Sequence, residues 1–496
     1  MLYRFPTRPT NIFRPIFGLL PLSILLCLPT AYGQTKPQEL SKNITLARSK
    51  VEGVVNRLLA KKTKVSILIE SQESGQILYE KNPDQRLHPA SNTKIITTAA
   101  TLDLLGPRFR WDTRIGADKI KNGIAENIYI IGRGDPRFVS ESLWALVLQA
   151  KKRGLKRVKG NVIIDDSYFT SDRMAPGFDD RDQDSAYRAA SGAMSLNFNS
   201  VSIGLKPSRK IGGKPVVNIY PDSGHILISN RAKTKRSGRE QLQLRADKKG
   251  ARTEIKLSGT IPIKHRGLMV RRRIDNPPIY AGDAAKLFFK QLGIPVRGAV
   301  KTGIAPTRLK SLARLKSRPL SLIIHDVNKL SNNFMAEQIL RTIGAEKSRM
   351  GDWTESARLV TRHLEKKYKL KGFTYVNGSG LFGNTAFSAR DLTTILKSID
   401  QSIPPQPEFL ASLAVSRVDG TLRKRFKSLP KGTIRAKTGT LDGVVCLSGY
   451  LYTKSGDTLI FSILMNDVIG KGWTVWKVQE EILQAFAGYS SPPKKD

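Results

Sequence analysis

The chain has 496 residues, and its 83 Lys and Arg against 41 Asp and Glu give a net charge of +42. This length can supply two or three hydrophobic cores. With only two cysteines the chain cannot rely on a disulfide framework, so its stability must come from packing.

The N-terminus has the layout of a secretory signal peptide. Three arginines precede or flank the start of an apolar run over residues 16–28, and Ala31-Tyr32-Gly33 forms a small-x-small cleavage site. We therefore expect residues 1–33 to direct export, leaving a protein that is periplasmic or otherwise extracytoplasmic, either soluble or peripherally associated with the envelope. The alternative is a membrane anchor made by the same segment, although its apolar run is short for a span.

The first elements predicted after this segment are a helix, a hairpin and a second helix. Residues 45–61 are amphipathic at helical spacing, and VSILIES with GQILYEK alternates as two strands around a turn. A helix is then predicted over 93–105. Ser91-Asn92-Thr93-Lys94 stands at its start, so Ser91 and Lys94, three residues apart, share one face of the first turn.

The middle of the chain is a long insertion. Helices are predicted in ESLWALVLQAKKRG and GDAAKLFFKQLG, with many short β-like segments around them. Residues 196–275 are the most basic part, with 19 Lys or Arg against 5 Asp or Glu. Such a field concentrates a protein on polyanions, although a general bias towards basic residues would explain it equally well.

The last third contains two more polar signatures. Ser331-Asn332-Asn333 precedes an amphipathic helix, and Lys437-Thr438-Gly439 lies on the first strand of a predicted three-stranded meander, which a C-terminal helix follows. Helix and hairpin at one end, with meander and helix at the other, predict a five-stranded antiparallel sheet built from both chain ends and flanked by helices. The fold class is therefore α+β.

Taken together, Ser-x-x-Lys, Ser-x-Asn and Lys-Thr-Gly are the three-part active site of penicillin-binding proteins and serine β-lactamases. Each pattern alone is weak, and Lys301-Thr302-Gly303 repeats the third one at a place where its order is wrong. We interpret that copy as a strand end or turn. Ser195-x-Asn197, in a run that alternates like a strand, is interpreted as structural.

The residue types suit acyl transfer. A serine hydroxyl needs a base, and Lys94 can be that base for Ser91 if burial and a second cation, Lys437, keep it neutral. Ser331 could pass a proton to a leaving amine, and Asn333 could hold Lys94 in place.

The third signature is expected to bind substrate. Lys437 and Thr438 could hold a substrate carboxylate, and Gly439 completes their signature. Backbone N–H groups of Ser91 and Thr440 could form an oxyanion hole. The five histidines form no pair at metal-ligand spacing, so no metal site is predicted.

The chain resembles the type-4, class C low-molecular-mass penicillin-binding proteins, the D-alanyl-D-alanine carboxypeptidase/endopeptidase family. Besides the three signatures, the resemblance includes Gly134-Asp135-Pro136, the VIIDDSYF segment, Ser195-Leu196-Asn197-Phe198-Asn199, Gly378-Ser379-Gly380-Leu381 and Asp419-Gly420-Thr421-Leu422. It implies a transpeptidase-like domain split by two nested insertions. The expected parts are the DD-peptidase domain (34–107 and 315–496), a second domain (108–195 and 276–314) and a basic, β-rich third domain (196–275).

The same resemblance implies a secreted DD-peptidase that acts on peptidoglycan stem peptides through an acyl-enzyme on Ser91. It would cleave the terminal D-Ala-D-Ala bond, D-amino-acid cross-links, or both, and β-lactams would inhibit it. No metal or organic cofactor is implied. Anionic envelope polymers or a membrane surface are the expected partners of the third domain, and nucleic acid is not expected.

Two positions depart from the family pattern. Family members commonly carry an arginine where this chain has Gly383, and a polar Gln near the subsite where it has Asp442. Losing a cation and gaining an anion favours a positively charged or amidated stem side chain, unless another Arg or Lys takes over. Two alternatives to a DD-peptidase stay open: a β-lactamase or esterase using the same residues, and a catalytically idle wall-binding protein.

Overall fold

The protein is described here from a computed structural model, which covers residues 37–178, 184–402, 405–470 and 472–490. The predicted signal peptide, residues 1–33, lies outside the described residues. The described part contains both helices and strands, and the strands form several separate sheets. The predicted α+β class is confirmed.

Segments from both ends of the chain form the central sheet, which is antiparallel with the order β18-β19-β20-β21-β1-β2. Five of these strands match the predicted hairpin and meander. The sixth was missed, because the two residues of β18 are too few to show an alternating pattern. The strands are β1 (Lys64–Ser71), β2 (Ile77–Lys81), β18 (Ala414–Val415), β19 (Ile434–Leu441), β20 (Val444–Tyr452) and β21 (Thr458–Asn466).

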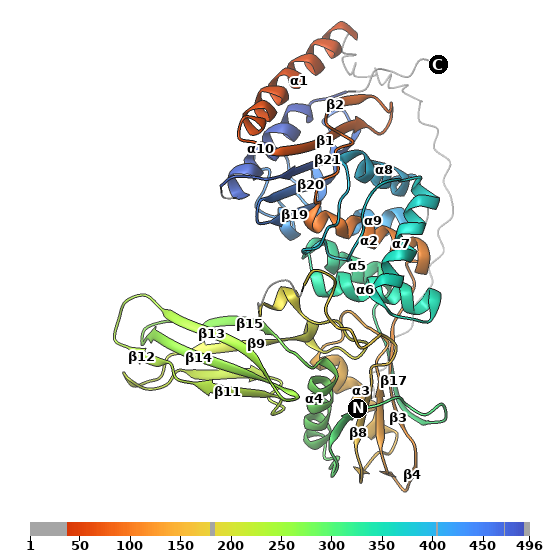
Figure 1. The fold of residues 1–496 in the computed structure, drawn as a ribbon, viewed down its shortest axis with the longest axis vertical. Coiled ribbons are helices and arrows are strands. Elements are labelled where there is room, and N and C mark those ends of the chain that lie inside the picture. Colours follow the sequence, from red (N-terminus) through yellow and green to blue (C-terminus); the bar gives the residue numbers. More distant parts are fainter. Residues whose placement is uncertain (1–36, 179–183, 403–404, 471, 491–496) are drawn as a thin grey trace, which may run out of the picture.

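Helices cover both faces of the central sheet (Figure 1). On one face α1 (Pro37–Leu59) and α10 (Gly472–Phe486) pack on an apolar cluster shared with β1 and β20. On the other face lie α2 (Thr93–Leu105) and α8 (Ala389–Asp400). Four further helices pack around α2: α5 (Leu320–Lys329), α6 (Asn333–Ser348), α7 (Trp353–Tyr368) and α9 (Pro405–Ser412).

A second body contains the five-stranded sheet β16-β8-β6-β3-β17, which combines parallel and antiparallel pairs. Helices α3 (Ser140–Lys152) and α4 (Pro277–Gln291) share its apolar core. Its strands are β3 (Asp112–Ala117), β6 (Ile128–Ile131), β8 (Val162–Asp165), β16 (Val300–Thr302) and β17 (Lys310–Lys316), and the short strands β4 (Ile120–Lys121), β5 (Ile124–Ala125) and β7 (Arg157–Val158) pair beside it.

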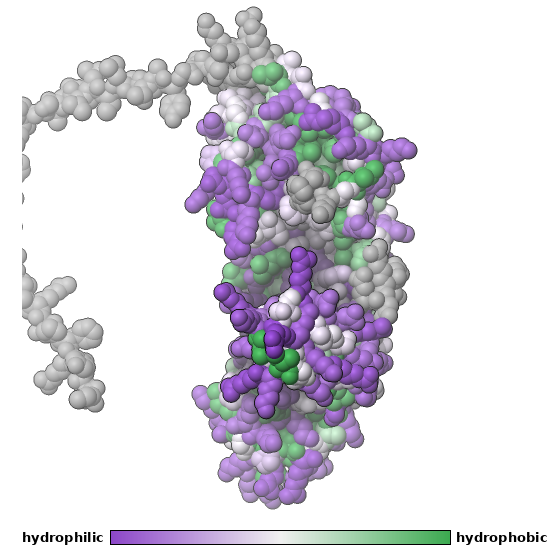
Figure 2. All heavy atoms as spheres, turned by 90° about the vertical axis from the view of Figure 1, so that its left-hand side faces the viewer, coloured by the Kyte–Doolittle hydropathy of each residue, from purple (hydrophilic) through white to green (hydrophobic). Residues whose placement is uncertain are grey.

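Residues 200–273, which we call the basic module, project sideways from the long axis of the molecule (Figure 1). They form two small sheets, β10-β9-β15 and β11-β14-β12, with β13 paired to β14. Hydrophilic side chains cover most of the face that this module presents (Figure 2). The strands are β9 (Ser200–Lys206), β10 (Val216–Tyr220), β11 (Ile226–Asn230), β12 (Lys233–Lys235), β13 (Gln241–Lys249), β14 (Arg252–Pro262) and β15 (Leu268–Arg273).

The segment before β9 differs from its prediction as a strand. Asn197, Phe198 and Asn199 all have positive φ, between 48° and 60°, so the chain turns sharply there. The Asn199 side chain donates hydrogen bonds to Ser195 Oγ (2.8 Å) and Ala190 O (2.7 Å), and these bonds hold the turn. Asparagine tolerates this left-handed conformation, which the alternating pattern could not reveal. The predicted domain boundaries stay predictions.

Candidate active site

Ser91 and Lys94 lie where a short 3-10 turn, Ala90–Asn92, runs directly into helix α2. Lys94 Nζ donates a hydrogen bond to Ser91 Oγ at 2.9 Å. The spacing of three residues therefore brings the two side chains together at the helix start. Asn92, a helix-start residue in the sequence, does not cap the helix, because its amide donates to Ser448 Oγ (2.7 Å) on strand β20 and so ties the turn to the central sheet.

The backbone beside Ser91 is strained. Ala90 is fully buried and has a φ of +47°, a region in which non-glycine residues are uncommon. Two glycines allow the surrounding chain to approach it. A Cβ at Gly380 would lie 2.0 Å from Ala90 O, and one at Gly439 would lie 2.8 Å from Pro89 O. Strain of this kind persists only where packing enforces it, and here packing fixes the position of Ser91.

Lys94 is fully buried and has three acceptors around its amine. Besides Ser91 Oγ, Nζ donates to Asn333 Oδ1 (2.7 Å) and to the backbone oxygen of Ser379 (2.8 Å). Burial lowers the pKa of Lys94 to about 7, while the negative charge of Glu337 acts in the opposite direction. An amine with this pKa changes protonation state near neutral pH, as a general base must.

Ser331 and Lys437 form a second pair. Lys437 Nζ donates to Ser331 Oγ at 2.9 Å and to the backbone oxygen of Thr438 at 2.7 Å. Burial, and then the positive charge of Lys94, lower the pKa of Lys437 well below its usual value. Ser331 has a φ of +55°, and the next residue, Asn332, caps helix α6 by accepting from Met335 N (3.0 Å). Asn333, the first residue of α6, thereby faces Lys94.

The remaining predicted residues follow Lys437 along β19. Thr438 is half-buried, and its hydroxyl donates to Thr421 Oγ1 at 2.9 Å. Gly439 is buried against the Ser91 turn, and Thr440 is exposed one residue further on. Asp442 lies outside this group, in the exposed turn between β19 and β20.

Three contributors were not among the residues predicted for the site. Glu337 is buried in helix α6 and accepts hydrogen bonds from Gly378 N and Ser379 N, both at 2.8 Å, while burial raises its pKa. It thus holds the loop whose Ser379 oxygen accepts from Lys94. Tyr187 O accepts from Asn333 Nδ2 at 3.2 Å. An acid inside the apolar run FMAEQILRTIG was the one available signal for Glu337, because a charged residue is rarely buried without a function or a partner.

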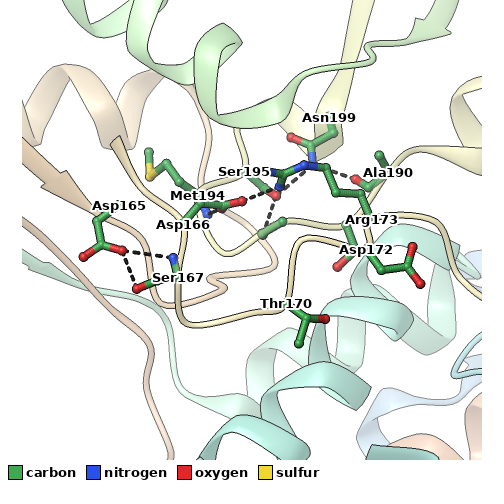
Figure 3. A network of polar contacts seen from close by, with 12 residues as sticks. Asp165, Asp166, Ser167, Thr170, Asp172, Arg173, Ala190, Met194, Ser195 and Asn199 are labelled. Atoms are coloured by element: carbon green, nitrogen blue, oxygen red, sulfur yellow. Dashed lines mark hydrogen bonds and ion pairs between the residues drawn. The ribbon is translucent and has the colours of Figure 1, made fainter. Parts of the chain in front are cut away.

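A polar network joins residues 165–173 to residues 190–199, as Figure 3 shows. Asp166 pairs with Arg173 and accepts from Met194 N. Helix α6 completes the attachment, because Gln338 Nε2 donates to Gly192 O at 3.0 Å and Arg341 Nη2 donates to Thr170 O at 2.8 Å. The network connects the second body to the helix that begins with Asn333.

Asp165 and Phe169, in the VIIDDSYF segment, have structural surroundings. Asp165 Oδ1 accepts from Ser167 N (2.9 Å) and Ser167 Oγ (2.6 Å), as Figure 3 shows, and Phe169 is buried beneath the Arg341 guanidinium. The second Lys-Thr-Gly, at 301–303, begins on the last two residues of strand β16 in the second body. That placement agrees with its interpretation as a strand end.

Two further properties concern the described ranges only. None of the helices there is long and apolar enough to cross a membrane. Among the same residues, no group of three His, Cys, Asp or Glu side chains is placed to hold a metal ion.

Comparison with known sequences identifies relatives over most of the chain. The model of the D-Ala-D-Ala carboxypeptidase 3 (S13) family matches residues 49–484. A D-alanyl-D-alanine carboxypeptidase from Actinomadura sp. (strain R39) is 28% identical over 494 residues, which cover 96% of this chain and 90% of the relative. The D-alanyl-D-alanine carboxypeptidase DacB of Haemophilus influenzae is 22% identical and covers 81% of this chain and 85% of its own.

Solved structures show the same fold. Penicillin binding protein 4 (dacB) from Haemophilus influenzae superposes with a TM-score of 0.77 at 21% identity, covering 88% of this chain and 99% of the other. A penicillin G-acylated predatory endopeptidase from Bdellovibrio bacteriovorus superposes with a TM-score of 0.51 at 18% identity, covering 84% and 91%. The predicted penicillin-binding fold is confirmed.

Proposed function

The chain belongs to the D-Ala-D-Ala carboxypeptidase 3 (S13) family, and from this membership we propose that Ser91 is the residue acylated in its reaction. The enzyme is a serine-type D-Ala-D-Ala carboxypeptidase/endopeptidase, a penicillin-binding protein that acts on peptidoglycan stem peptides. The observation that supports Ser91 most directly is its 2.9 Å contact with a buried lysine whose pKa is about 7.

Acylation begins with a proton transfer from Ser91 to Lys94. The three acceptors around Nζ match the three N–H groups of an ammonium. After deprotonation, two N–H groups remain for Asn333 and Ser379, and the lone pair faces the Ser91 hydroxyl. Ser91 Oγ then attacks the substrate carbonyl carbon as its proton moves to Lys94, which forms a tetrahedral intermediate.

Collapse of that intermediate breaks the C–N bond and needs a proton on the leaving amine. Ser331 is our candidate for delivering it, since Lys437 Nζ donates to its oxygen and leaves the hydroxyl proton of Ser331 free to move. The proton on Lys94 replaces the one that Ser331 gives up. Water then attacks the Ser91 ester with neutral Lys94 again as base, which releases the acid and restores the serine.

Substrate binding is assigned to strand β19. Lys437 and Thr438 would hold the carboxylate at the end of the substrate by charge-assisted hydrogen bonds, and Gly439 lets the strand lie against the Ser91 turn. The N–H groups of Ser91 and Thr440 would stabilise the oxyanion. β-Lactams would acylate the same serine and block the site.

This enzyme should differ from its relatives in its preference for the third residue of the stem peptide. The loop at Gly383 has no arginine, and Asp442 is exposed after β19. We propose a preference for an amidated or basic stem side chain. Another cation could nevertheless take the place of that arginine. The buried Arg188 guanidinium lies 5.6 Å from the ring centre of Phe382, which is next to Gly383.

Export is proposed from the sequence of residues 1–33. Its removal would leave 80 basic residues against 41 acidic ones in an extracytoplasmic enzyme. Such a protein would be either soluble or peripherally bound to the envelope.

The basic module is proposed to bind anionic envelope polymers. Three of its segments, 206–214, 233–240 and 262–267, form what we call the module tip, which holds ten Lys or Arg and a single acid. Hydrogen bonds join them, from Gly212 N to Thr234 O (2.7 Å) and from Ile263 N to Lys235 O (2.8 Å). The one acid, Glu240, lies 3.3 Å from His265. A tip with so few carboxylates attracts polyanions at low ionic strength.

Release of D-alanine from a synthetic stem pentapeptide tests the reaction. We expect the mature enzyme to release it and Ser91→Ala to release none above background, while both proteins melt at similar temperatures. An active Ser91→Ala enzyme would refute the role of Ser91. An inactive wild type that binds penicillin and loses it rapidly would instead indicate a β-lactamase.

A further inference from the structure

We propose that a basic groove beside the active site binds the second stem peptide of a cross-link, on the side from which the leaving group departs. The groove encloses about 970 Å³, and Thr421, Arg423, Lys424, Lys427 and Trp476 are among its lining residues. The proposal rests on the function proposed above and makes cross-linked stems the preferred substrate.

The groove is continuous with the substrate-binding strand through Thr421. Its hydroxyl accepts from Thr438 Oγ1 at 2.9 Å and also lines the groove. The preceding residue, Gly420, is held against the site, since a Cβ there would lie 2.8 Å from Lys329 O, two residues before Ser331. Lys329 in turn pairs with Asp419. The groove wall and the Ser331 loop are thus fixed to each other.

The orientation of the substrate determines which part of it would reach the groove. If Lys437 and Thr438 hold the terminal carboxylate, the residue they hold is the one that leaves. A free D-alanine ends at that carboxylate and has nothing to place beyond Thr438. In a cross-link the leaving amine belongs to another stem peptide, which must continue past Thr438 to the Thr421 wall. A groove at that wall is therefore of use only to the larger leaving group.

The charge of the groove suits an acidic peptide. Arg423, Lys424 and Lys427 are exposed, and none of them has an ion-pair partner among the described residues. The two acids in the lining have cations beside them, because Glu480 pairs with Arg425 at 3.1 Å and Glu481 lies 3.8 Å from Arg57. A stem peptide ends in a carboxylate, so the three exposed cations would attract it.

Trp476, in the lining of the groove, is in contact with the buried Arg425. Arg425 is buried, donates to Trp476 O at 3.0 Å, and lies 5.5 Å from the centre of the Trp476 ring. The indole is 38% exposed and offers a flat apolar surface at a fixed position. Trp and Arg are enriched among the residues that contribute most to binding at protein interfaces, so this lining suits a peptide ligand.

The test compares two substrates in one set of variants: a monomeric stem pentapeptide and a cross-linked stem dimer. Arg423→Gln/Lys424→Gln/Lys427→Gln should lower kcat/KM for the dimer at least tenfold, chiefly through KM. For the pentapeptide, and for acylation by penicillin, the change should stay within twofold. The matched control Lys151→Gln/Lys152→Gln/Arg153→Gln removes the same charge from exposed residues at the end of helix α3 and should alter neither value.

The outcomes distinguish failure of the groove proposal from failure of the proposed function. Equal losses for dimer and pentapeptide, or no loss for either, would overturn the groove proposal while leaving the serine mechanism intact. Failure of the wild type to react with penicillin or either substrate would overturn the proposed function itself. If the triple variant does not fold, the single variants carry the test, each with an expected two- to threefold loss for the dimer alone.

Discussion

The active site and the basic module use the same side chain in opposite ways. Lys94 and Lys437 are fully buried, and each donates to a specific serine at 2.9 Å. Lys206 and Lys210 of the module tip, by contrast, are exposed and have no ion-pair partner among the described residues. Burial lowers the pKa of a lysine and gives its amine specific hydrogen-bond partners, whereas an exposed lysine keeps its charge and acts together with the other charges around it.

The largest effect should come from replacing a lysine of the first kind. Lys94→Met removes the donor to Ser91 and, in the proposed mechanism, the base, so we expect acylation by penicillin to slow by about 10²–10⁴-fold, the range typical of general-base catalysis. Lys210→Met, the same change at the module tip, should leave the rate unchanged. Stopped-flow experiments with both variants measure the acylation rate. Similar rates for the two would contradict the claim that only the buried lysine is needed for acylation.

The pH dependence of acylation should follow the pKa of Lys94, which burial lowers. In the proposed mechanism the neutral form of Lys94 is the active one. Because its pKa is about 7, the rate should rise about tenfold per pH unit below that value and level off above it. At pH 5 this predicts a rate roughly 100-fold below the plateau. A rate that keeps rising towards pH 10 would mean that Lys94 titrates like an exposed lysine.

Glu337 is a buried acid near Lys94, and it holds the loop whose Ser379 oxygen accepts a hydrogen bond from Lys94. Glu337→Gln removes one of two acceptors for the Gly378 and Ser379 N–H groups, which we expect to destabilise the fold by about 1–3 kcal/mol and to slow acylation roughly tenfold. Loss of its negative charge should also lower the pKa of Lys94, moving the midpoint of the pH profile to lower pH.

The matched control for this variant is Glu365→Gln, on the exposed side of helix α7. It should change neither melting temperature nor pH profile. A midpoint that moves upward in Glu337→Gln would show that the carboxyl acts on Lys94 by some means other than its charge.

The smallest effects on the fold are expected at the module tip. Lys206→Gln/Lys210→Gln/Lys214→Gln should change the free energy of unfolding by no more than about 0.5 kcal/mol per site. Binding to a soluble teichoic-type polymer should weaken several-fold at low salt and converge with the wild type at high salt. Sedimentation with phosphatidylglycerol vesicles instead of the polymer would identify a membrane surface as the partner.

Much of the fold followed from local pattern. The strands around Lys437 and the hairpin after α1 alternate clearly. The three polar signatures, together with the long insertion and several further segments, indicated the family from the sequence. The two-residue strand β18 could not be predicted, because two residues are too few to show an alternating pattern. The left-handed turn at Asn197–Asn199 was missed because the pattern of apolar and polar residues does not reveal a positive φ.

The site was predictable only where a signature carries it. Ser91 and Lys94 are neighbours on one helix, so spacing alone brings them together. Glu337 and the Ser379 oxygen act through a backbone loop from another part of the chain, and a backbone acceptor leaves no mark in a sequence. Asp442 was predicted because it is close to Lys437 in the sequence, but it lies on an exposed turn.

The most direct test is to locate the covalent adduct. Mature enzyme is treated with penicillin, quenched and digested, and the acylated peptide is identified by mass spectrometry. The account predicts one adduct, on the peptide containing Ser91, which disappears in Ser91→Ala and forms at the wild-type rate in the module-tip variant. An adduct on Ser331 or on a peptide of the basic module would contradict it.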